Sequence, residues 1–395
     1  MNNNPIVIAG MARTPMGGFQ GALREVSAPK LGSFAIRAAL ERSGLQTDDI
    51  DEVLMGCVLP AGMGQAPARQ ASLGAGIPTA TGCTTVNKMC GSGMKTTMLA
   101  HDALLAETNE IMIAGGMESM TNAPYILQKA RSGQRLGHGE MSDHMFLDGL
   151  EDVYEKGTLM GVFAERTAKS YGFTREEQDE FAIRSLTRAK KAIEDGSFRE
   201  EITQVSFHDR KGETVIEQDE QPLSANFEKI PKLRPAFEKG GTVTAANSSS
   251  ISDGAAALVM MTESTAKKQG LTPLARILGH SSFAQSPDWF TTAPIGAIKK
   301  LLKKVGWVKH DVDLFEINEA FATVTMAAMK DLDLPAEKVN IHGGACALGH
   351  PVGASGTRIL VTLIAALRKY QKTRGVASLC IGGGEATAMA VQVLS

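Results

Sequence analysis

Cysteine is scarce in this sequence, and the spacing of a metal or redox motif is missing. The 395 residues include five cysteines, an odd number, and no two of them form a C-x-x-C pair. This disfavours a disulfide framework or a zinc site and favours free thiols in a reducing compartment. Each thiol is then either buried filler or a reactive group. The five are Cys57, Cys83, Cys90, Cys346 and Cys380.

Long apolar runs are missing too. No stretch of about eighteen apolar residues indicates a membrane span. The N-terminal sequence "MNNNPIVIAGMARTP" has a short apolar run with no basic region before it, which predicts a first β-strand and not a signal peptide. We therefore expect a cytoplasmic protein with no membrane partner.

Neither sign of charge is in excess. Lysine and arginine together number 41 against 43 acidic residues, and the formal net charge is -2. A nucleic-acid partner is therefore not expected, although a local patch could hold a small phosphorylated ligand. The signatures of serine esterases (G-x-S-x-G), P-loop proteins (GK[ST]) and zincins (H-E-x-x-H) are absent, and no glycine cluster has the frame of a dinucleotide fingerprint.

The chain contains an internal repeat. Residues 35–56, "AIRAALERSGLQTDDIDEVLMG", align without a gap on residues 297–318, "AIKKLLKKVGWVKHDVDLFEIN", and six of 22 positions are identical. Each copy predicts an amphipathic helix that ends near Gly44 or Gly306, followed by an Asp-containing turn and an apolar strand. The same α/β unit is therefore expected twice.

The duplication extends beyond this unit. Gly-rich turns at 91–93 and 353–356 each lead into a helical run, at about 93–106 and 356–369, and then into the strands "EIMIAGGMES" and "ASLCIGGGEA". Alternation of strands and helices with Gly-rich turns predicts a layered α/β fold whose ligands lie at the ends of strands.

Three segments are expected. The N-terminal half covers residues 1–118 and is completed by about 248–270, where the sequence returns to a strand pattern. The C-terminal half covers 271–395. Between them, the polar, charged and Pro-containing stretch 119–247 predicts an inserted loop domain that covers the site.

This insert contains one strongly predicted helix, "TREEQDEFAIRSLTRAKKAIEDG". Thr174 is the expected N-cap, Glu177 its capping-box partner, and Gly196 the stop.

Cys90 is the first chemical candidate. It stands in "TTVNKMCGSGMK", residues 84–95, between a short β-like run and a helical pattern. A thiol at a helix N-terminus feels the positive end of the helix dipole, so a lowered pKa and a reactive thiolate are expected. Gly91 and Gly93 would let a substrate approach and leave backbone N–H groups free. The alternative is a buried structural cysteine.

Three further candidates stand at the ends of strands or helices. His350, in "HGGACALGHPVGASG", is a candidate base for a thiol from the other half, or a structural histidine. Cys380 ends the strand of "SLCIGGGEA", where the glycines, including Gly382, make either a tight turn or a backbone oxyanion hole. Asn318 takes the place of Gly56 in the repeat, which suits a site residue or a turn former.

Together, these stretches resemble the thiolase family. The resemblance runs from "PIVIAGMARTPMGGFQGAL" through "GTVTAANSSSISDGAAA" to the C-terminus and covers essentially the whole chain. Its motifs are the Cys90 turn, N-E-A-F at 318–321, G-H-P at 349–351 and C-x-G at 380–382. The resemblance implies the thiolase fold, an α/β architecture of two duplicated layered halves with an inserted loop domain.

The resemblance also implies roles for the candidate residues. Cys90 would be the nucleophile that carries the acyl group as a thioester, and His350 would accept its proton. Cys380 would remove the α-proton of acetyl-CoA in synthesis, or return it in cleavage. One oxyanion hole would be His350 with a water held by Asn318, and the other would be the backbone N–H groups of Cys90 and Gly382.

For binding, the resemblance implies that Ser249 contacts the pantetheine arm of coenzyme A and that Phe321 and Met160 line the tunnel. Two departures from the family pattern fall in this tunnel. Leu159 stands where short-chain biosynthetic thiolases usually carry histidine, and "DEQPL" at 219–223 replaces an acidic-then-Arg stretch.

The implied activity is that of an acetyl-CoA C-acetyltransferase, which reversibly condenses two acetyl-CoA to acetoacetyl-CoA and CoA through an acyl-cysteine. No metal or organic cofactor is expected, since coenzyme A is itself substrate and product. The alternatives are a broader-chain 3-ketoacyl-CoA thiolase of fatty-acid β-oxidation and a non-catalytic thiolase-like lipid or CoA carrier. A homotetramer built as a dimer of dimers is also implied.

Overall fold

The computed structural model describes residues 4–209 and 212–394. Residues 1–3 and 395, at the outer ends of the two predicted halves, lie outside the described residues. The same holds for residues 210–211 of the predicted insert.

In the N-terminal half, five strands lie in the order β4-β3-β5-β10-β1. β3 runs parallel to both of its neighbours, while β10 is antiparallel to β5 and to β1. The strand that follows the insert in sequence therefore lies in the middle of the first half's sheet. The bounds are β1 Ile6–Arg13, β2 Gly17–Gly18, which pairs with β10, β3 Glu52–Gly56, β4 Gly82–Val86, β5 Ile111–Ser119 and β10 Ser252–Thr262.

The C-terminal half repeats this pattern in the order β12-β13-β14-β11. β12 is parallel to β13, and the next two pairings are antiparallel, as for β3, β5, β10 and β1. The two halves join where β1 and β11 pair, at Val7 with Arg276 and Ile8 with Ala275. The bounds are β11 Ala275–Ala284, β12 Leu314–Ile317, β13 Arg374–Ile381 and β14 Glu385–Val393.

The repeated unit is confirmed. Helices α1 (Ala28–Ser43) and α8 (Ala293–Val305) precede β3 and β12, and they end at Gly44 and Gly306. Both glycines have left-handed φ angles, 81° and 71°, which residues with a side chain rarely adopt. The stop signals in the sequence therefore marked the ends of both helices correctly.

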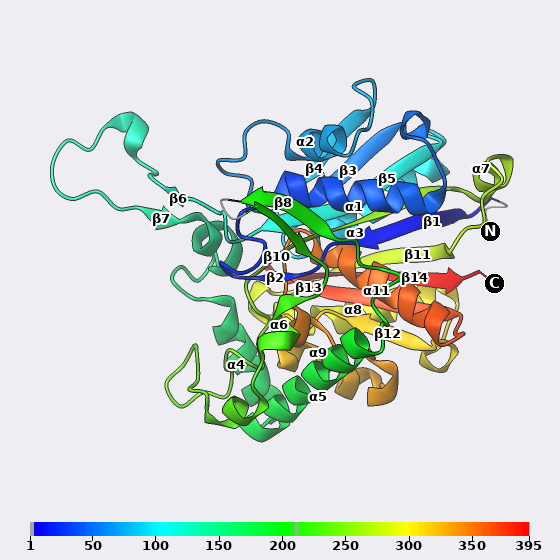
Figure 1. Ribbon diagram of the computed structural model, residues 1–395. Coiled ribbons are helices and arrows are strands. Elements are labelled where there is room, and N and C mark those ends of the chain that lie inside the picture. Colours follow the sequence, from blue (N-terminus) through cyan, green and yellow to red (C-terminus); the bar gives the residue numbers. More distant parts are fainter. Residues whose placement is uncertain (1–3, 210–211, 395) are drawn as a thin grey trace.

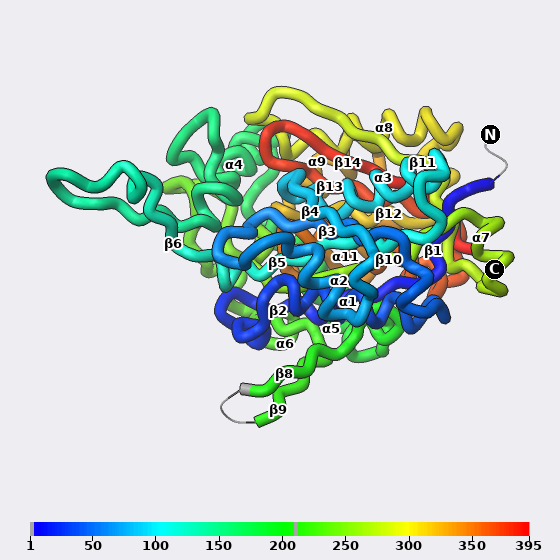
Figure 2. Tube along the Cα trace, turned by 90° about the horizontal axis from the view of Figure 1, so that it is seen from above, coloured from blue at the N-terminus to red at the C-terminus, as the bar shows by residue number. Residues whose placement is uncertain are grey.

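Helices and strands alternate in layers (Figures 1 and 2), and three of the apolar cores lie between these layers. The first core lies between the N-terminal strands and the helices α1 and α2 (Pro67–Gly74). The second surrounds α3 (Ser92–Leu105) and α11 (Ser355–Lys369), which pack against each other between the halves. The third lies between the C-terminal strands and the helices α8 and α9 (Ala322–Leu332). Each half thus presents the start of its inner helix to the other half.

The stretch 119–247 contains two main helices, α4 (Met160–Tyr171) and α5 (Arg175–Glu194). The predicted capping box of α5 is confirmed, because the Thr174 hydroxyl accepts from Glu177 N at 3.2 Å and the Glu177 carboxylate accepts from Thr174 N at 2.8 Å. The loop between β6 and β7 projects away from the body in both views (Figures 1 and 2). The remaining elements here are β6 Tyr125–Ile126, β7 Ser142–Asp143, β8 Val205–Asp209, β9 Gly212–Ile216 and α6 Glu220–Ser224.

The "DEQPL" stretch has a structural function. The buried Asp219 accepts two hydrogen bonds from the buried Arg13, at 2.7 and 2.9 Å, and Glu220 accepts from the backbone of Gly18 and Ala22. Two short helices complete the fold, α7 Glu263–Lys268 and α10 Ala345–Leu348. Across the described ranges, no helix has the length and apolar character that a membrane crossing needs.

Candidate active site

Cys90 lies in the turn between β4 and α3, where the backbone is tightly constrained. Met89, just before it, has a left-handed φ of 48°, and Gly91 is the N-cap of α3. A Cβ built on Gly91 would lie 2.4 Å from Cδ1 of Ile381, and one on Gly93 would lie 2.8 Å from the backbone N of Thr357. Packing is thus a further reason for glycine at these two positions, because the C-terminal half lies directly against them. That they let a substrate approach the thiol stays a prediction.

A largely apolar cavity of about 470 Å³ adjoins this turn. Residues from both halves and from the insert line it, including six of the eight residues singled out from the sequence. These six are Cys90, Met160, Ser249, Phe321, His350 and Gly382. The other two, Cys380 and Asn318, are fully buried beside it, with exposures of 0% and 1%. The sequence-predicted site residues thus converge on one place.

The Cys90 thiol does not have the lowered pKa that its helix position predicted. Burial raises its pKa to about 11, although the backbone N–H groups of Gly382 and of Cys90 itself act in the opposite direction. The helix dipole is thus outweighed by removal of the thiolate from water. The same contacts place two backbone donors at the sulfur, which is where an oxyanion hole for an acyl-cysteine would be needed.

His350 is held in one tautomer by Ser355. The hydroxyl of Ser355 donates to the Pro351 carbonyl at 3.0 Å, so its oxygen accepts from Nδ1 of His350, 2.5 Å away. The proton of the neutral ring is therefore on Nδ1, and Nε2 carries a lone pair. Nε2 is buried and has no hydrogen-bond partner among the described residues. Burial, with a smaller effect from Arg358, lowers the pKa of His350 to about 3.

Asn318 follows β12 and is oriented by an arginine. Its Oδ1 accepts from Nη2 of Arg358 at 3.4 Å, and its Nδ2 is buried with no partner in the described part of the chain. Arg358 also donates to Glu316 at 3.0 Å. The carboxamide therefore has its donor end available for a ligand.

Cys380 stands one residue before the end of β13, and the chain then turns through Gly383 and Gly384, whose φ angles are 92° and 89°. Its side chain packs in a small cluster with Met160 and Phe321. Burial, and then the neighbouring Cys90 thiol, raise the pKa of Cys380 well above the ordinary value. The second thiol is thus close to the first and more deeply buried, since Cys380 is fully buried and Cys90 only partly.

A second cavity, of about 210 Å³, continues from the first, since Gln221 and Ala245 line both. Cys346, Ala347, Ile230 and other residues of α5, α10 and the insert form its walls. The second cavity thus adjoins the cavity beside Cys90.

Three residues near the site were missed from the sequence: Ser355, Arg358 and Glu118. Glu118 is fully buried at the end of β5 and accepts from the backbone N–H groups of Val58, Leu59 and Gly353, at 2.9, 3.1 and 2.9 Å. Burial raises the pKa of Glu118 to about 7. An arginine in the apolar run "TRILVTLIAAL" was a usable signal for Arg358, because a charged residue is almost never buried without a partner.

Known protein families and relatives match the chain along almost its whole length. Residues 6–264 match the family described as "Thiolase, N-terminal domain", and residues 271–393 match "Thiolase, C-terminal domain". Acetyl-CoA acetyltransferase 2 of Arabidopsis thaliana is 49% identical over 397 residues, covering 100% of this chain and 98% of that protein.

Solved structures superpose closely. An acetyl-CoA acetyltransferase from Bacillus anthracis has a TM-score of 0.96 at 42% identity, with 99% of both chains covered. The Acat5 thiolase of Ascaris suum, solved in complex with coenzyme A, has a TM-score of 0.93 at 40% identity, covering 99% of this chain and 100% of that one.

Proposed function

This chain belongs to the thiolase family, and on that basis we propose that it is an acetyl-CoA C-acetyltransferase. It would reversibly condense two acetyl-CoA to acetoacetyl-CoA and CoA. The observation that carries the proposal is the meeting of two thiols and a lone-pair imidazole nitrogen beside one apolar cavity. Relatives across the full chain carry the name acetyl-CoA acetyltransferase.

In the first half-reaction, Cys90 gives its proton to Nε2 of His350, and its sulfur attacks the thioester carbonyl of acetyl-CoA. The bond from carbonyl to CoA sulfur breaks, and CoA leaves with the proton from His350. This leaves acetyl-Cys90. The tautomer fixed by Ser355 suits this step, because only Nε2 with a free lone pair can accept the proton.

In the second half-reaction, Cys380 first gives its proton to Nε2 of His350 and then, as a thiolate, removes the α-proton of another acetyl-CoA. The enolate carbon attacks the carbonyl of acetyl-Cys90, a carbon–carbon bond forms, and the Cys90 thiolate leaves and takes the proton from His350. The burial that raises the pKa of Cys380 also makes its thiolate a strong base, which suits a weakly acidic α-proton.

Two sets of donors would stabilise the oxyanions. The backbone N–H groups of Cys90 and Gly382 lie against the Cys90 sulfur and suit its acyl oxygen. Nδ2 of Asn318 and protonated Nε2 of His350 suit the thioester oxygen of the other substrate, with a water on Asn318. Neither half-reaction needs a metal or organic cofactor.

The two adjoining cavities would form a path that suits coenzyme A. Ser249 would contact the pantetheine arm, and Met160 and Phe321 would flank it where it meets Cys90. We propose that the insert, 119–247, covers this path, since Met160 and Phe237 line the first cavity and Ile230 the second.

A broader-chain 3-ketoacyl-CoA thiolase is the second candidate. Phe146, Leu150 and Leu159 line the same cavity as Cys90, and their apolar surfaces could accept a longer chain. A non-catalytic carrier is disfavoured, because a carrier would not need the tautomer-fixed His350 beside two thiols.

The test is the rate of CoA-dependent thiolysis of acetoacetyl-CoA against a medium-chain 3-ketoacyl-CoA, in wild type and in Cys90→Ser. Preference for acetoacetyl-CoA, with activity lost in the variant, is expected. Faster medium-chain cleavage would move the protein to the degradative class. No acyl-enzyme at Cys90 by mass spectrometry would support a carrier instead.

We further propose that the protein is a homotetramer. We also propose that it lies in the cytoplasm and acts in fatty acid metabolism. The loop that projects between β6 and β7 carries exposed apolar side chains, with Leu136 98% and Met141 71% exposed, which suits contact with another copy. All five cysteines are free, which is typical of proteins in a reducing compartment. Light scattering of the purified protein measures the assembly.

A further inference from the structure

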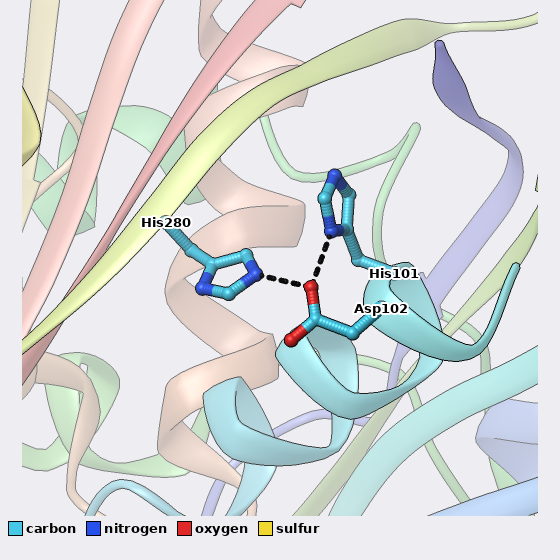
Figure 3. A group of neighbouring side chains, drawn as sticks. All are labelled: His101, Asp102 and His280. Carbon is cyan, nitrogen blue, oxygen red and sulfur yellow. Dashed lines mark hydrogen bonds and ion pairs between the residues drawn. The ribbon is translucent and has the colours of Figure 1, made fainter. Parts of the chain in front are cut away.

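A second group of reactive side chains lies outside the cavity, where the end of α3 meets β11 (Figure 3). Oδ1 of Asp102 is 3.0 Å from Nδ1 of His101 and 2.9 Å from Nε2 of His280. The three potential ligand atoms lie within 4.8 Å of one another. We propose that His101, Asp102 and His280 form a binding site for a divalent transition-metal ion of the zinc type.

The donor set matches this class of ion. Zinc takes imidazole nitrogen and carboxylate oxygen in tetrahedral sites at roughly 2.0–2.2 Å, which separates neighbouring ligand atoms by roughly 3.4 Å. The two separations from Oδ1 of Asp102, 2.9 and 3.0 Å, need to lengthen by a few tenths of an ångström, and the two imidazole nitrogens lie within 4.8 Å of each other. Calcium and magnesium prefer ligand sets made of oxygen and are not expected to bind.

Binding requires a change of tautomer at each ring. The hydrogen bonds to Asp102 use the nitrogens that would hold the metal, whereas the other nitrogen of each ring points away from the carboxylate (Figure 3). The N–H proton would move through solvent to that other nitrogen. Each neutral imidazole would then offer its lone pair to the ion, with no net proton released.

The rings are held in place before any ion arrives. The side chains of His101 and His280 are each only 11% exposed, and the rings meet edge to face with centroids 5.0 Å apart. Little side-chain freedom is therefore left to lose on binding. The Asp102 side chain is 57% exposed, so the open side of the site faces solvent, where water can complete a tetrahedral set.

The nearby charges set the strength of binding. Asp102 supplies a negative charge, but the Lys304 ammonium donates to the His280 carbonyl at 3.1 Å and acts electrostatically on both imidazoles. This positive charge opposes the approach of a cation. Removing it should tighten binding without removing a ligand.

The ion would connect the two halves of the fold. His101 and Asp102 belong to α3, whose first turn follows Cys90, and His280 belongs to β11 of the C-terminal half. A ligand that binds only the folded state raises the unfolding temperature, and the effect grows with the logarithm of the ligand concentration above Kd. The expected role is therefore stabilisation of the contact between α3 and β11, and not a step of the reaction.

Cobalt(II) provides a direct probe of the site. The intact protein, freed of metal with a chelator, is titrated with Co²⁺ while visible absorption is followed. We expect one ion per chain with the strong visible bands of tetrahedral cobalt, and no near-ultraviolet band from a thiolate ligand. Zn²⁺ should displace the cobalt and raise the unfolding temperature, whereas Mg²⁺ should do neither.

Variants test the assignment. Asp102→Asn keeps an acceptor for both imidazoles and so should preserve the fold, and His280→Ala removes a ligand; each should abolish the visible bands. His310→Ala changes an exposed histidine outside the cluster and should leave the bands unchanged. Lys304→Gln should bind cobalt several-fold more tightly.

Any of four results would overturn the proposal. The first is a protein without visible bands at millimolar Co²⁺, and the second is bands that survive in both Asp102→Asn and His280→Ala. A thiolate band alone would place the ion at the cysteines. Equal affinity in wild type and Lys304→Gln would also contradict the site. Thiolase activity enters none of these readouts, so they stand apart from the proposed reaction.

Discussion

Nη2 of Arg358 donates a hydrogen bond to Oδ1 of Asn318 across 3.4 Å, from the first turn of α11 to the residue after β12. A carboxamide held by its oxygen has its Nδ2 turned to the other side, and here that atom is buried without a partner among the described residues. Arg358 thus acts as a positioning residue for a donor that the proposed reaction uses.

Asn318→Ala should lower kcat by roughly 100-fold to 1,000-fold, the usual effect of losing one oxyanion donor. Arg358→Lys keeps the charge beside Glu316 but cannot make both bonds, so a loss of about 10-fold in kcat is expected with little change in KM. In the Asn318→Ala background, the second substitution should have almost no further effect on kcat. Equal losses from Arg358→Lys in both backgrounds would mean that the arginine does not act through Asn318.

Ser355 should control the proton on His350. Ser355→Ala removes the acceptor for Nδ1–H, so the ring can shift its proton to Nε2 and lose its function as a base. We expect acetylation of Cys90 to slow by roughly 10-fold to 100-fold in rapid-quench experiments, a partial loss of general-base catalysis. Ser355→Thr retains the hydroxyl and should recover most of the rate. If alanine and threonine variants react alike, the hydroxyl does not set the tautomer.

The pH dependence of Cys90 alkylation should show an unactivated thiol. Burial raises the pKa of Cys90 to about 11 and lowers that of His350 to about 3, so thiol and neutral imidazole coexist between these values. In the free enzyme, the rate with iodoacetamide should rise about tenfold per pH unit up to about pH 11, because only the thiolate reacts. Mass spectrometry of the modified peptide, with Cys90→Ser as control, identifies the site. A plateau near neutral pH would instead reveal a preformed thiolate–imidazolium pair.

His350 should also make the fold sensitive to acid. Its pKa falls from the ordinary 6.5 to about 3 in the folded state, so in this window the unfolded chain binds a proton that the folded chain does not. Stability is therefore complete above about pH 6.5 and is lost as the pH falls toward 3. In His350→Gln, the free energy of unfolding should depend less steeply on pH between these values.

Urea titrations at several pH values measure this slope. His342, whose pKa burial lowers to about 4, provides a positive control, because His342→Gln should flatten the same curve over a narrower range. A slope that does not change in His350→Gln would mean that the imidazole is protonated in the folded protein.

The sequence predicted those parts of the fold that depend on nearby residues. Gly44 and Gly306 stop their helices because a left-handed residue is needed there, and Thr174 with Glu177 forms its capping box within one turn. Two other contacts around the site join residues that are distant in the sequence. Arg358 donates to Asn318, 40 positions before it, and Glu118 of the N-terminal half accepts from Gly353 of the C-terminal half, so no local pattern predicts either contact.

The pKa of Cys90 illustrates the same limit. The sequence located the thiol beside a helix N-terminus, and the favourable dipole follows from that position alone. The opposing effect of burial depends on how residues from the C-terminal half and the insert surround the sulfur, which no local pattern reports.

The last prediction concerns Gly93, where helix propensity and packing predict opposite results. In a helix, replacement of glycine by alanine usually stabilises by about 1 kcal/mol. At Gly93, however, the new Cβ would lie 2.7 Å from Oγ1 and 2.8 Å from the backbone N of Thr357, and backbone cannot yield as a flexible side chain does. Gly93→Ala should therefore lower the free energy of unfolding by about 1–3 kcal/mol, the typical cost of overpacking.

Gly82→Ala is the matched control, since the nearest atom to its new Cβ is 3.8 Å away, and its stability should be unchanged or slightly raised. Urea denaturation of both variants measures the difference, and thiolysis of acetoacetyl-CoA shows whether the shift reaches Cys90. Because α3 would have to move away from α11 to admit the methyl group, kcat should fall in Gly93→Ala even where the protein is fully folded. A stabilised Gly93→Ala with normal kcat would show that the contact between the two helices can relax, and that the cysteine turn does not depend on their close approach.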